Sequence, residues 1–295
     1  MREFRRCVVA GGNGHVGWMF TALLTGTGSE VVCVDQAPPT GSPGARWLVG
    51  DICRPDSAVA DAVESADLLL LAVPEPVALA AVRVIGPLLR PGALYADTLS
   101  VKSRIAAEVA RWLPGVAAVS LNPMFGPSLG PSGRVIAAVT LTDGPPVGAL
   151  RNLLREAGAR VVDVTASEHD RITAVSQAVT HAAVLSFGLA AAELGVDVRT
   201  LRALAPPPHE TMLALLARIA SGTAEVYWDI QAGNPDAQDA RDALRRGMER
   251  LSSLGGQNEF ADVLGEIRGF LGEGDLTALA GTCALLFRAL DTGAA

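Results

Sequence analysis

The chain of 295 residues has few cysteines, a single lysine and no long apolar run, and each of these shortages excludes a class of protein. Cys7, Cys33, Cys53 and Cys283 show neither the paired spacing of a metal site nor the density of a disulfide-stabilised secreted domain. Apolar runs such as residues 68–73 are too short to cross a bilayer. We therefore expect buried thiols, no bound metal and no membrane insertion.

Clustered positive charge is also missing, and the formal net charge is -7. Nucleic acids and anionic membranes bind surfaces rich in lysine and arginine, so neither partner is expected. Residues 1–6 include three arginines and a glutamate and then enter a short strand pattern, which does not fit a secretory leader. We expect a cytoplasmic protein in which any anionic ligand meets positive charge locally.

Apolar residues are abundant, at 49% of the chain against 19% charged, and the length suggests two domains. Up to about residue 165, short apolar runs alternate with apolar residues at helical spacing, which indicates a parallel sheet covered by helices. The expected strands are residues 4–10, 30–34, 68–73, 93–97, 116–121, 135–141 and 160–164. The expected helices between them are residues 16–24, 56–63, 77–89, 103–112 and 147–156. The sequence predicts an α/β fold with a doubly wound parallel sheet over residues 1–165.

The strand pattern ends after Thr165, and helical patterns rich in alanine and leucine follow. They cover residues 168–194, 211–220, 236–254 and 259–271. We expect an all-helical C-terminal domain over residues 166–295. Its apolar positions are numerous enough for one face to pack outside its own domain, and a homodimer interface is the simplest explanation.

A glycine-rich motif follows the first expected strand and opens a helix. It reads Gly12-Asn13-Gly14-His15-Val16-Gly17 and fits G-x-G-x-x-G. Gly12 permits a tight turn, Gly14 lets the backbone approach a pyrophosphate, and Gly17 allows the helix to pack closely on the strand. Asp35 ends the next strand, where a carboxylate would bind ribose hydroxyls and repel a 2′-phosphate. The motif predicts a Rossmann domain that binds NAD rather than NADP, with His15 near phosphate or solvent.

Two further loops follow strand ends, which line the cofactor crevice in this fold. Val73 and Pro74 come after a run of four leucines, and they either contact the nicotinamide half of the cofactor or simply end the strand. Lys102, the only lysine, follows another strand end and indicates a ligand anchor. Ser100 offers its hydroxyl to a substrate or to Asn122, although a serine there also suits a helix N-cap.

Several segments together resemble the prephenate dehydrogenase family. They are residues 96–102 with Ser-Val-Lys, 122–127 with Pro-Met-Phe-Gly-Pro, 166–170 with Glu-His-Asp, and the helix with Gln177 and His181. The resemblance implies NAD-dependent oxidative decarboxylation of a small dicarboxylate, with a helical domain that binds substrate and forms the dimer. It also implies that Arg218 pairs with a substrate carboxylate. Gln177 and His181 would lie near the same pocket, unless His181 is a structural core histidine.

Asn122 is where the sequence departs from that family, whose members carry a histidine at this position. The histidine takes the proton from the ring 4-hydroxyl of prephenate while hydride leaves the same carbon, and an asparagine amide cannot act as this base. An amino group in place of the hydroxyl can stabilise the developing cation as an iminium without simultaneous proton loss. Asparagine would then suffice to accept an N–H and orient the amine. We therefore expect 4-amino-4-deoxyprephenate as substrate, as in related enzymes of antibiotic pathways, and 4-aminophenylpyruvate as product.

Two alternatives stay open at the level of the sequence. One is a prephenate or arogenate dehydrogenase of tyrosine biosynthesis, in which a water held by Ser100 or His181 replaces the missing base. The other is a catalytically silent NAD-sensing protein that kept the fold after losing the histidine. Retention of Lys102, Arg218 and Gln177 speaks against a sensor, because a nucleotide sensor has no need of carboxylate anchors.

Overall fold

The computed structural model describes residues 4–41 and 44–292. Residues 1–3, on which part of the expectation of no leader rests, lie outside this range. The chain forms two compact units. The first comprises the chain up to Thr173 together with Trp228–Asp236, and the second comprises Ala174–Tyr227 and the chain from Ala237 onward. The first unit thus includes more than residues 1–165, and the division at residue 165 stays a prediction.

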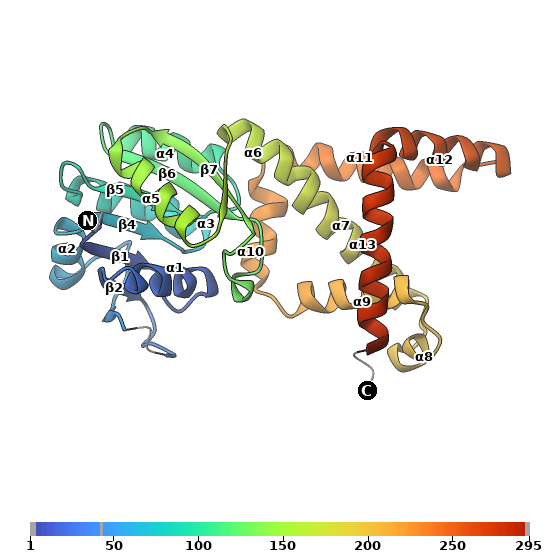
Figure 1. Ribbon diagram of the computed structural model, residues 1–295, viewed down its shortest axis with the longest axis horizontal. Helices are drawn as coiled ribbons and strands as arrows, with labels where there is room; N and C mark the ends of the chain where they lie inside the picture. The colour runs from blue at the N-terminus through green and yellow to red at the C-terminus, as the bar shows by residue number, and fades with distance from the viewer. Residues whose placement is uncertain (1–3, 42–43, 293–295) are drawn as a thin grey trace. The chain divides into compact units, whose positions relative to one another are not determined.

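One eight-stranded sheet forms the centre of the first unit, in the order β3-β2-β1-β4-β5-β6-β7-β8 (Figure 1). The strands are β1 (Arg6–Ala10), β2 (Glu30–Asp35), β3 (Arg46–Val49), β4 (Leu68–Leu71), β5 (Leu94–Asp97), β6 (Ala117–Pro123), β7 (Val135–Thr142) and β8 (Arg160–Asp163). Neighbouring strands are parallel except for β6 and β7, which pair antiparallel. The predicted fold class, a Rossmann sheet followed by a helical region, is confirmed.

The sheet differs from the sequence prediction in two places. Strand β3 was not predicted, because its four residues lie at the sheet edge and none of them is fully buried. Strand β7 runs antiparallel to β6 because the segment that connects them, residues 124–134, contains only a short 3-10 turn, Pro127–Leu129. A parallel connection needs a longer crossover, usually a helix.

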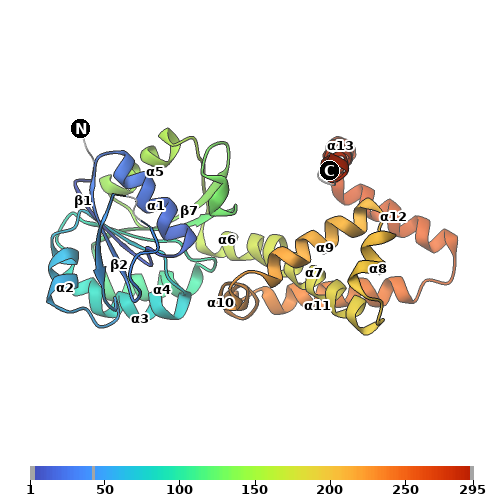
Figure 2. The ribbon, with the colours of Figure 1, turned by 90° about the horizontal axis from the view of Figure 1, so that it is seen from below.

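Helices cover both faces of the sheet, as Figure 2 shows. One face is covered by α1 (His15–Gly26) and α5 (Pro145–Glu156), and the other by α2 (Ser57–Glu64), α3 (Glu75–Ile85) and α4 (Ser103–Trp112). Alternate strand residues enter the two cores: Val9 packs in the cluster of Phe20 from α1, and Val8 in the cluster of Val82 from α3. This arrangement leaves the carboxyl ends of the parallel strands at one edge, where the predicted site residues of the first unit lie.

Helices make up the remainder of the described chain. They are α6 (Ala166–Thr173), a π-helical turn η3 (Ala174–Val179), α7 (Thr180–Glu193), α8 (Val198–Ala203), α9 (Pro207–Ala220), α10 (Ala224–Trp228), a second π-helical turn η4 (Asp229–Gly233), α11 (Ala237–Ser252), α12 (Gln257–Leu271) and α13 (Glu273–Thr292). The four helical segments expected from the sequence are present. Helices α8, α10 and α13 were not predicted, since two of them are very short and glycines interrupt the apolar pattern of the third.

One continuous helical stretch in the described chain, Ala166–Glu193, has the length and mean hydropathy, 1.4, that a membrane span requires. The pair α12 and α13 meets the same test only as a span bent by 98°. The first stretch holds the buried, hydrogen-bonded His169 and Asp170 near its beginning. Only 22% of its most apolar window is buried within one copy of the chain. Its apolar surface is thus largely free to pack against another molecule.

The glycines of the first turn lead to a test of the packing beneath α1. A Cβ on Gly17 would lie 2.1 Å from the carbonyl oxygen of Gly11, whereas Gly26 in the same helix has no heavy atom within 4 Å of that position. We expect Gly17→Ala to lower the free energy of unfolding by about 1–3 kcal/mol, because the backbone must move to relieve the overlap. Gly26→Ala, the matched control, should leave it unchanged or slightly raised. Urea unfolding of both variants measures the difference, and equal stabilities would contradict this packing.

Candidate active site

The glycine motif forms the turn between β1 and α1. The N–H of Gly14 donates to the carbonyl oxygen of Gly11 at 3.1 Å, and a Cβ on Gly12 would lie 2.9 Å from the Cβ of Cys33. Helix α1 has no acidic residue in its first turn, so no side chain of the helix itself competes with an anion at its N-terminus. Such a turn accepts a pyrophosphate through its backbone.

His15 and Val16 begin α1. His15 is exposed and lines a cavity of about 310 Å³ together with Pro127 and Ser128, which belong to the segment after β6. Val16 is half-buried and packs against the core beneath the helix. The structure therefore places His15 at the surface of the glycine turn and packs Val16 against the core, and contact of either residue with a cofactor stays a prediction.

Asp35 is fixed at the end of β2 beside the same turn. Its Oδ2 accepts the N–H of Asn13 at 3.0 Å and its Oδ1 accepts the N–H of Ala37 at 3.1 Å. The side-chain amide of Asn13 donates to the carbonyl oxygens of Ala37 and Pro38. Asn13 thus fastens the loop after β2 to the glycine turn, and direct contact between Asn13 and a cofactor stays a prediction.

The loop after β4 lies against the glycine turn. The Cγ1 of Val73 would be 3.0 Å from a Cβ placed on Gly11, and Pro74 is the N-cap residue of α3. Pro74 therefore ends the strand and begins a helix, and Val73 borders the turn. A contact of either residue with the nicotinamide stays a prediction.

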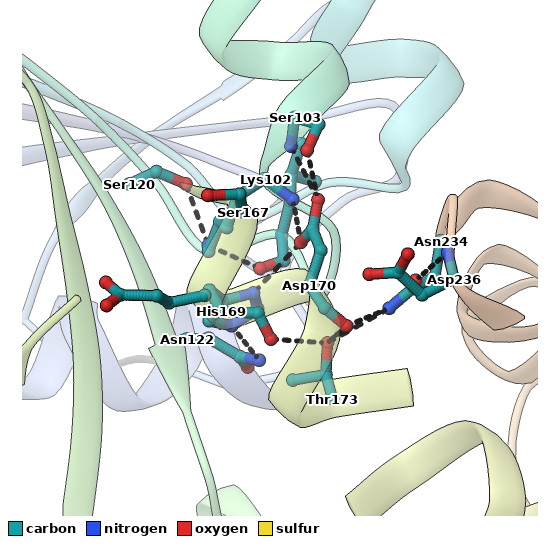
Figure 3. A network of polar contacts seen from close by, with 12 residues as sticks. Lys102, Ser103, Ser120, Asn122, Ser167, His169, Asp170, Thr173, Asn234 and Asp236 are labelled. Carbon is teal, nitrogen blue, oxygen red and sulfur yellow. Dashed lines mark hydrogen bonds and ion pairs between the residues drawn. The ribbon is translucent and has the colours of Figure 1, made fainter. Parts of the chain in front are cut away.

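Lys102 is fully buried, and its ammonium group is hydrogen-bonded to three oxygens of the protein, of which the Ser120 hydroxyl is labelled in Figure 3. Its Nζ donates to the carbonyl oxygen of Leu99 at 2.5 Å, to the Oγ of Ser120 at 2.7 Å and to the carbonyl oxygen of Leu121 at 2.7 Å. An ammonium has three N–H donors, so none remains for a ligand. This geometry contradicts the prediction that Lys102 anchors a substrate carboxylate. The isolated lysine of the sequence is a structural group.

The charge of Lys102 is balanced by Asp97, whose Oδ1 lies 3.8 Å from Nζ. Burial lowers the pKa of Lys102 to about 8, while Asp97 and Asp170 oppose the shift. The lysine therefore keeps its proton at neutral pH. Burial likewise raises the pKa of Asp97, against the effect of Lys102. Ser100, between these residues in sequence, is half-buried, and its hydroxyl makes no hydrogen bond within residues 4–41 and 44–292, so it is free to meet a ligand.

Asn122 lies near the end of β6 and is 3% exposed. Its Nδ2 is 3.0 Å from the Nε2 of His169, and the Nδ1 of His169 is 3.1 Å from the Oδ1 of Asp170. The three side chains thus form a hydrogen-bonded chain that runs from α6 to β6, visible in Figure 3. The Oδ1 of Asn122 accepts no hydrogen bond from the described part of the chain and stays available for a substrate.

Asp170 also joins α6 to the start of α4. Its carboxylate accepts the N–H groups of Lys102 at 2.8 Å and Ser103 at 2.9 Å. Burial acts to raise the pKa of Asp170, but the hydrogen bonds from His169, Ser103 and Lys102 prevail and lower it. Burial lowers the pKa of His169, against the opposite effect of its hydrogen bond with Asp170. Asp170 is therefore an anion and His169 a neutral imidazole at neutral pH.

His169 and Asp170 had no assigned role in the sequence analysis, although their Glu-His-Asp motif contributed to the resemblance. The same holds for Asn234, whose amide donates to the carbonyl oxygen of Asp170 at 2.8 Å. Little in the sequence indicated this role for Asn234, because the contact joins positions 64 residues apart. Only the fold brings these side chains together.

Gln177, His181 and Arg218 belong to the second unit. The Oε1 of Gln177 and the Nδ1 of His181 are buried and find no partner within the described residues. Burial lowers the pKa of His181, and the charge of Arg218 lowers it further. Arg218 itself is exposed in the last turn of α9. A buried nitrogen of His181 without a partner, close enough to Arg218 to sense its charge, is what a polar, anionic ligand would satisfy.

Two family models match the chain. Residues 24–163 match the nucleotide-binding domain of prephenate dehydrogenase, and residues 165–266 match its dimerization domain. The chain belongs to the prephenate dehydrogenase family. Its fold agrees with solved members, including prephenate dehydrogenase from Aquifex aeolicus in complex with hydroxyphenyl propionate and NAD+, at a TM-score of 0.68 and 18% identity over 93% of this chain and 98% of that one. Synechocystis arogenate dehydrogenase has the same TM-score of 0.68, with 17% identity over 92% of this chain and 99% of that one.

Among relatives in sequence, similarity is high to one enzyme with a specialised name. The chain is 53% identical over 97% of its length, and 98% of the relative's, to 4-amino-4-deoxyprephenate dehydrogenase of Streptomyces pristinaespiralis. It is 26% identical over 83% of its length to a probable arogenate/prephenate dehydrogenase of Methanocaldococcus jannaschii, of which it covers 56%. The chain therefore resembles both the amino-substrate and the hydroxyl-substrate members of the family.

Because Lys102 is buried, its substitution can distinguish a structural role from a role in ligand binding. We expect Lys102→Met to lower the free energy of unfolding by about 3–5 kcal/mol, because it leaves Asp97 as an uncompensated buried charge. Ser100→Ala is the matched control two residues away and should change the stability by less than about 0.5 kcal/mol. Guanidinium unfolding of the wild type, Lys102→Met and Ser100→Ala measures the differences in stability. Wild-type stability in the methionine variant would return Lys102 to the role of a ligand anchor.

Proposed function

We propose that the chain catalyses NAD-dependent oxidative decarboxylation of 4-amino-4-deoxyprephenate to 4-aminophenylpyruvate. The observation that carries the proposal is Asn122, in the position for which the family resemblance implies a histidine base. The only imidazole that contacts Asn122 within the described chain is His169, and its Nε2 already faces the Asn122 amide. The substrate named for the Streptomyces relative supports the same choice.

NAD is the cofactor, and the residues of the glycine turn fit it. Gly12 and Gly17 have no room for a side chain, and the open N-terminus of α1 suits a pyrophosphate. The Asp35 carboxylate lies beside this turn, where it would accept ribose hydroxyls and repel a 2′-phosphate. When bound, NAD accepts the hydride that leaves carbon 4 of the ring.

Asn122 serves the reaction by orientation rather than proton transfer. Loss of hydride from the carbon that bears the amine develops an iminium, which keeps its N–H groups. The Oδ1 of Asn122 accepts one of them, and this hydrogen bond strengthens as positive charge grows on the nitrogen. A hydroxyl substrate would instead have to release its proton, and Asn122 cannot take it. Decarboxylation at carbon 1 then completes aromatisation of the ring.

The substrate also carries two carboxylates, and we propose that Arg218 binds one of them. Its guanidinium is exposed and can form a bidentate pair. The unpartnered atoms of Gln177 and His181 support their place in the same polar pocket. Ser100, with its free hydroxyl at the strand end, is a further candidate for contact with the substrate.

The runner-up is a prephenate or arogenate dehydrogenase, in which a water held by Ser100 or His181 acts as the base. The buried Nδ1 of His181 has no partner within the described residues, so it is available to hold such a water, and this observation supports the alternative. A catalytically silent NAD sensor is less well supported. It would have no use for unpaired polar groups beside an arginine.

We propose that the chain works as a homodimer through its helical region, which matches the family's dimerization domain. Exposed apolar side chains support this assembly. On α12 they recur at helical spacing in Phe260, Leu264 and Ile267. We also propose a cytoplasmic location, since the four cysteines are free thiols, which suits a reducing compartment.

Substitution of Asn122 tests the substrate assignment. The wild type should oxidise 4-amino-4-deoxyprephenate much faster than prephenate. Asn122→His supplies a proton acceptor, so kcat/KM for prephenate should rise by up to about 100-fold, the usual contribution of a general base, while activity on the amino substrate falls or stays level. NADH formation measures both, and Asn122→Ala is the control for loss of the amide alone. Efficient turnover of prephenate by the wild type, with no gain in the histidine variant, would favour the runner-up.

A further inference from the structure

The Asp170 carboxylate is held by four hydrogen bonds. Its Oδ1 accepts from the N–H of Lys102 and faces the Nδ1 of His169, while its Oδ2 accepts the N–H and the hydroxyl of Ser103 at 2.9 Å and 2.5 Å. The N–H groups of Lys102 and Ser103 open helix α4, whose dipole favours a negative charge there. Asp170 thus caps a helix 67 residues away and remains an anion.

An anion at this point determines the tautomer of His169. The atom facing the Asp170 oxygen is Nδ1, so Nδ1 must carry a proton and donate it. A neutral imidazole has only one N–H, and its other nitrogen is an acceptor. The charged groups near the ring are Asp170 on its own helix, Lys102 before α4 and Asp97 at the end of β5. The Nε2 of His169 therefore presents a lone pair.

The lone pair on Nε2 in turn determines how the Asn122 amide is turned. The group of Asn122 that lies 3.0 Å from Nε2 must donate, and it is the Nδ2 amine. The reverse orientation would bring Oδ1 against Nε2, two acceptors in a buried place without a proton between them. The carbonyl oxygen of Asn122 consequently points away from His169.

We propose that Asp170 and His169 are positioning residues that set the polarity of the Asn122 amide, so that its oxygen rather than its NH2 group faces the substrate amine. The inference rests on the proposed function, because an amine and its iminium offer N–H donors and need an acceptor. With the opposite polarity, the NH2 of Asn122 would meet the N–H groups of the substrate. Specificity for the amine thus depends on a carboxylate that never touches the substrate.

Asp170→Asn is the variant that reverses this polarity. An asparagine can offer its NH2 to the Nδ1 of His169 while its oxygen still accepts the N–H and the hydroxyl of Ser103, and it then loses the hydrogen bond that Oδ1 accepts from the N–H of Lys102. His169 then becomes an acceptor at Nδ1 and a donor at Nε2, and the Asn122 amide turns over. Nitrogen NMR of the protein labelled with 15N-histidine reads the tautomer directly and needs no substrate. We expect an unprotonated Nε2 in the wild type and a protonated Nε2 in the variant, with His169→Asn to assign the signal.

Steady-state kinetics measure how the reversed polarity of the Asn122 amide affects catalysis. Asp170→Asn should lower kcat by about 10-fold or more, as loss of a tautomer-fixing partner typically does, and leave the KM for NAD close to its wild-type value. Ser103→Ala, which removes a cap contact but leaves the group facing His169 unchanged, should keep kcat near wild type. In an Asn122→Ala background, Asp170→Asn should cost nothing further. Equal losses in both backgrounds, or an unchanged tautomer in the variant, would overturn the proposal and leave Asp170 as a helix cap only.

A second pair of variants covers the case in which Asp170→Asn does not fold. His169→Gln can still accept the Asn122 NH2 through its side-chain oxygen, whereas His169→Asn keeps only the contact with Asp170. The glutamine variant should therefore retain the higher kcat, and equal values would contradict the proposal. All kinetic arms use whichever of 4-amino-4-deoxyprephenate and prephenate the wild type oxidises faster. If that substrate is prephenate, the proposed function fails, while the polarity of Asn122 is still decided by the NMR result.

Discussion

The sealed ammonium of Lys102 is the interaction on which the geometry of the site depends. It binds the carbonyl oxygens of Leu99 and Leu121, one after β5 and one within β6, and so holds two neighbouring strand ends at a fixed spacing. Asn122 is the next residue after Leu121. A buried charge is tolerated only when its partners are all in place, so this position is defined sharply. Small errors in the spacing of the strand ends would move the Asn122 amide, which the proposed function places at the substrate.

Much of the first unit could be predicted from the sequence, because its signals are local. A glycine turn after an apolar strand, with Asp35 at the end of the next strand, identifies the nucleotide site from fewer than 40 residues. The period of the apolar residues also separated the sheet from the helical region. The edge strand β3 and the antiparallel direction of the predicted strand β7 escaped prediction, since each depends on what lies beside it in the sheet rather than on its own residues.

The roles of single polar side chains were harder to foresee. Lys102 had the pattern of a ligand anchor, and only the fold shows that three protein oxygens surround it. Asp170 had no pattern at all as a cap, because the helix it caps begins 67 residues earlier. Asn122 was recognisable as a departure from the family, but the state of its amide follows from two neighbours that a linear reading cannot place. Partners distant in the sequence decide whether a polar residue is structural or functional.

The segment Trp228–Asp236 returns to the nucleotide-binding unit after the chain has passed through much of the helical region. The N–H of Glu75 donates to Asp229 at 3.2 Å, and Asn234 binds the carbonyl oxygen of Asp170 and the hydroxyl of Thr173. This unit is therefore discontinuous in the gene. A single crossover between two family members cannot exchange this unit alone, and a recombination point between its two segments would separate Asp170 from Asn234, to which it is hydrogen-bonded. A chimaera keeps the native contacts between the two segments only when it takes both from the same parent.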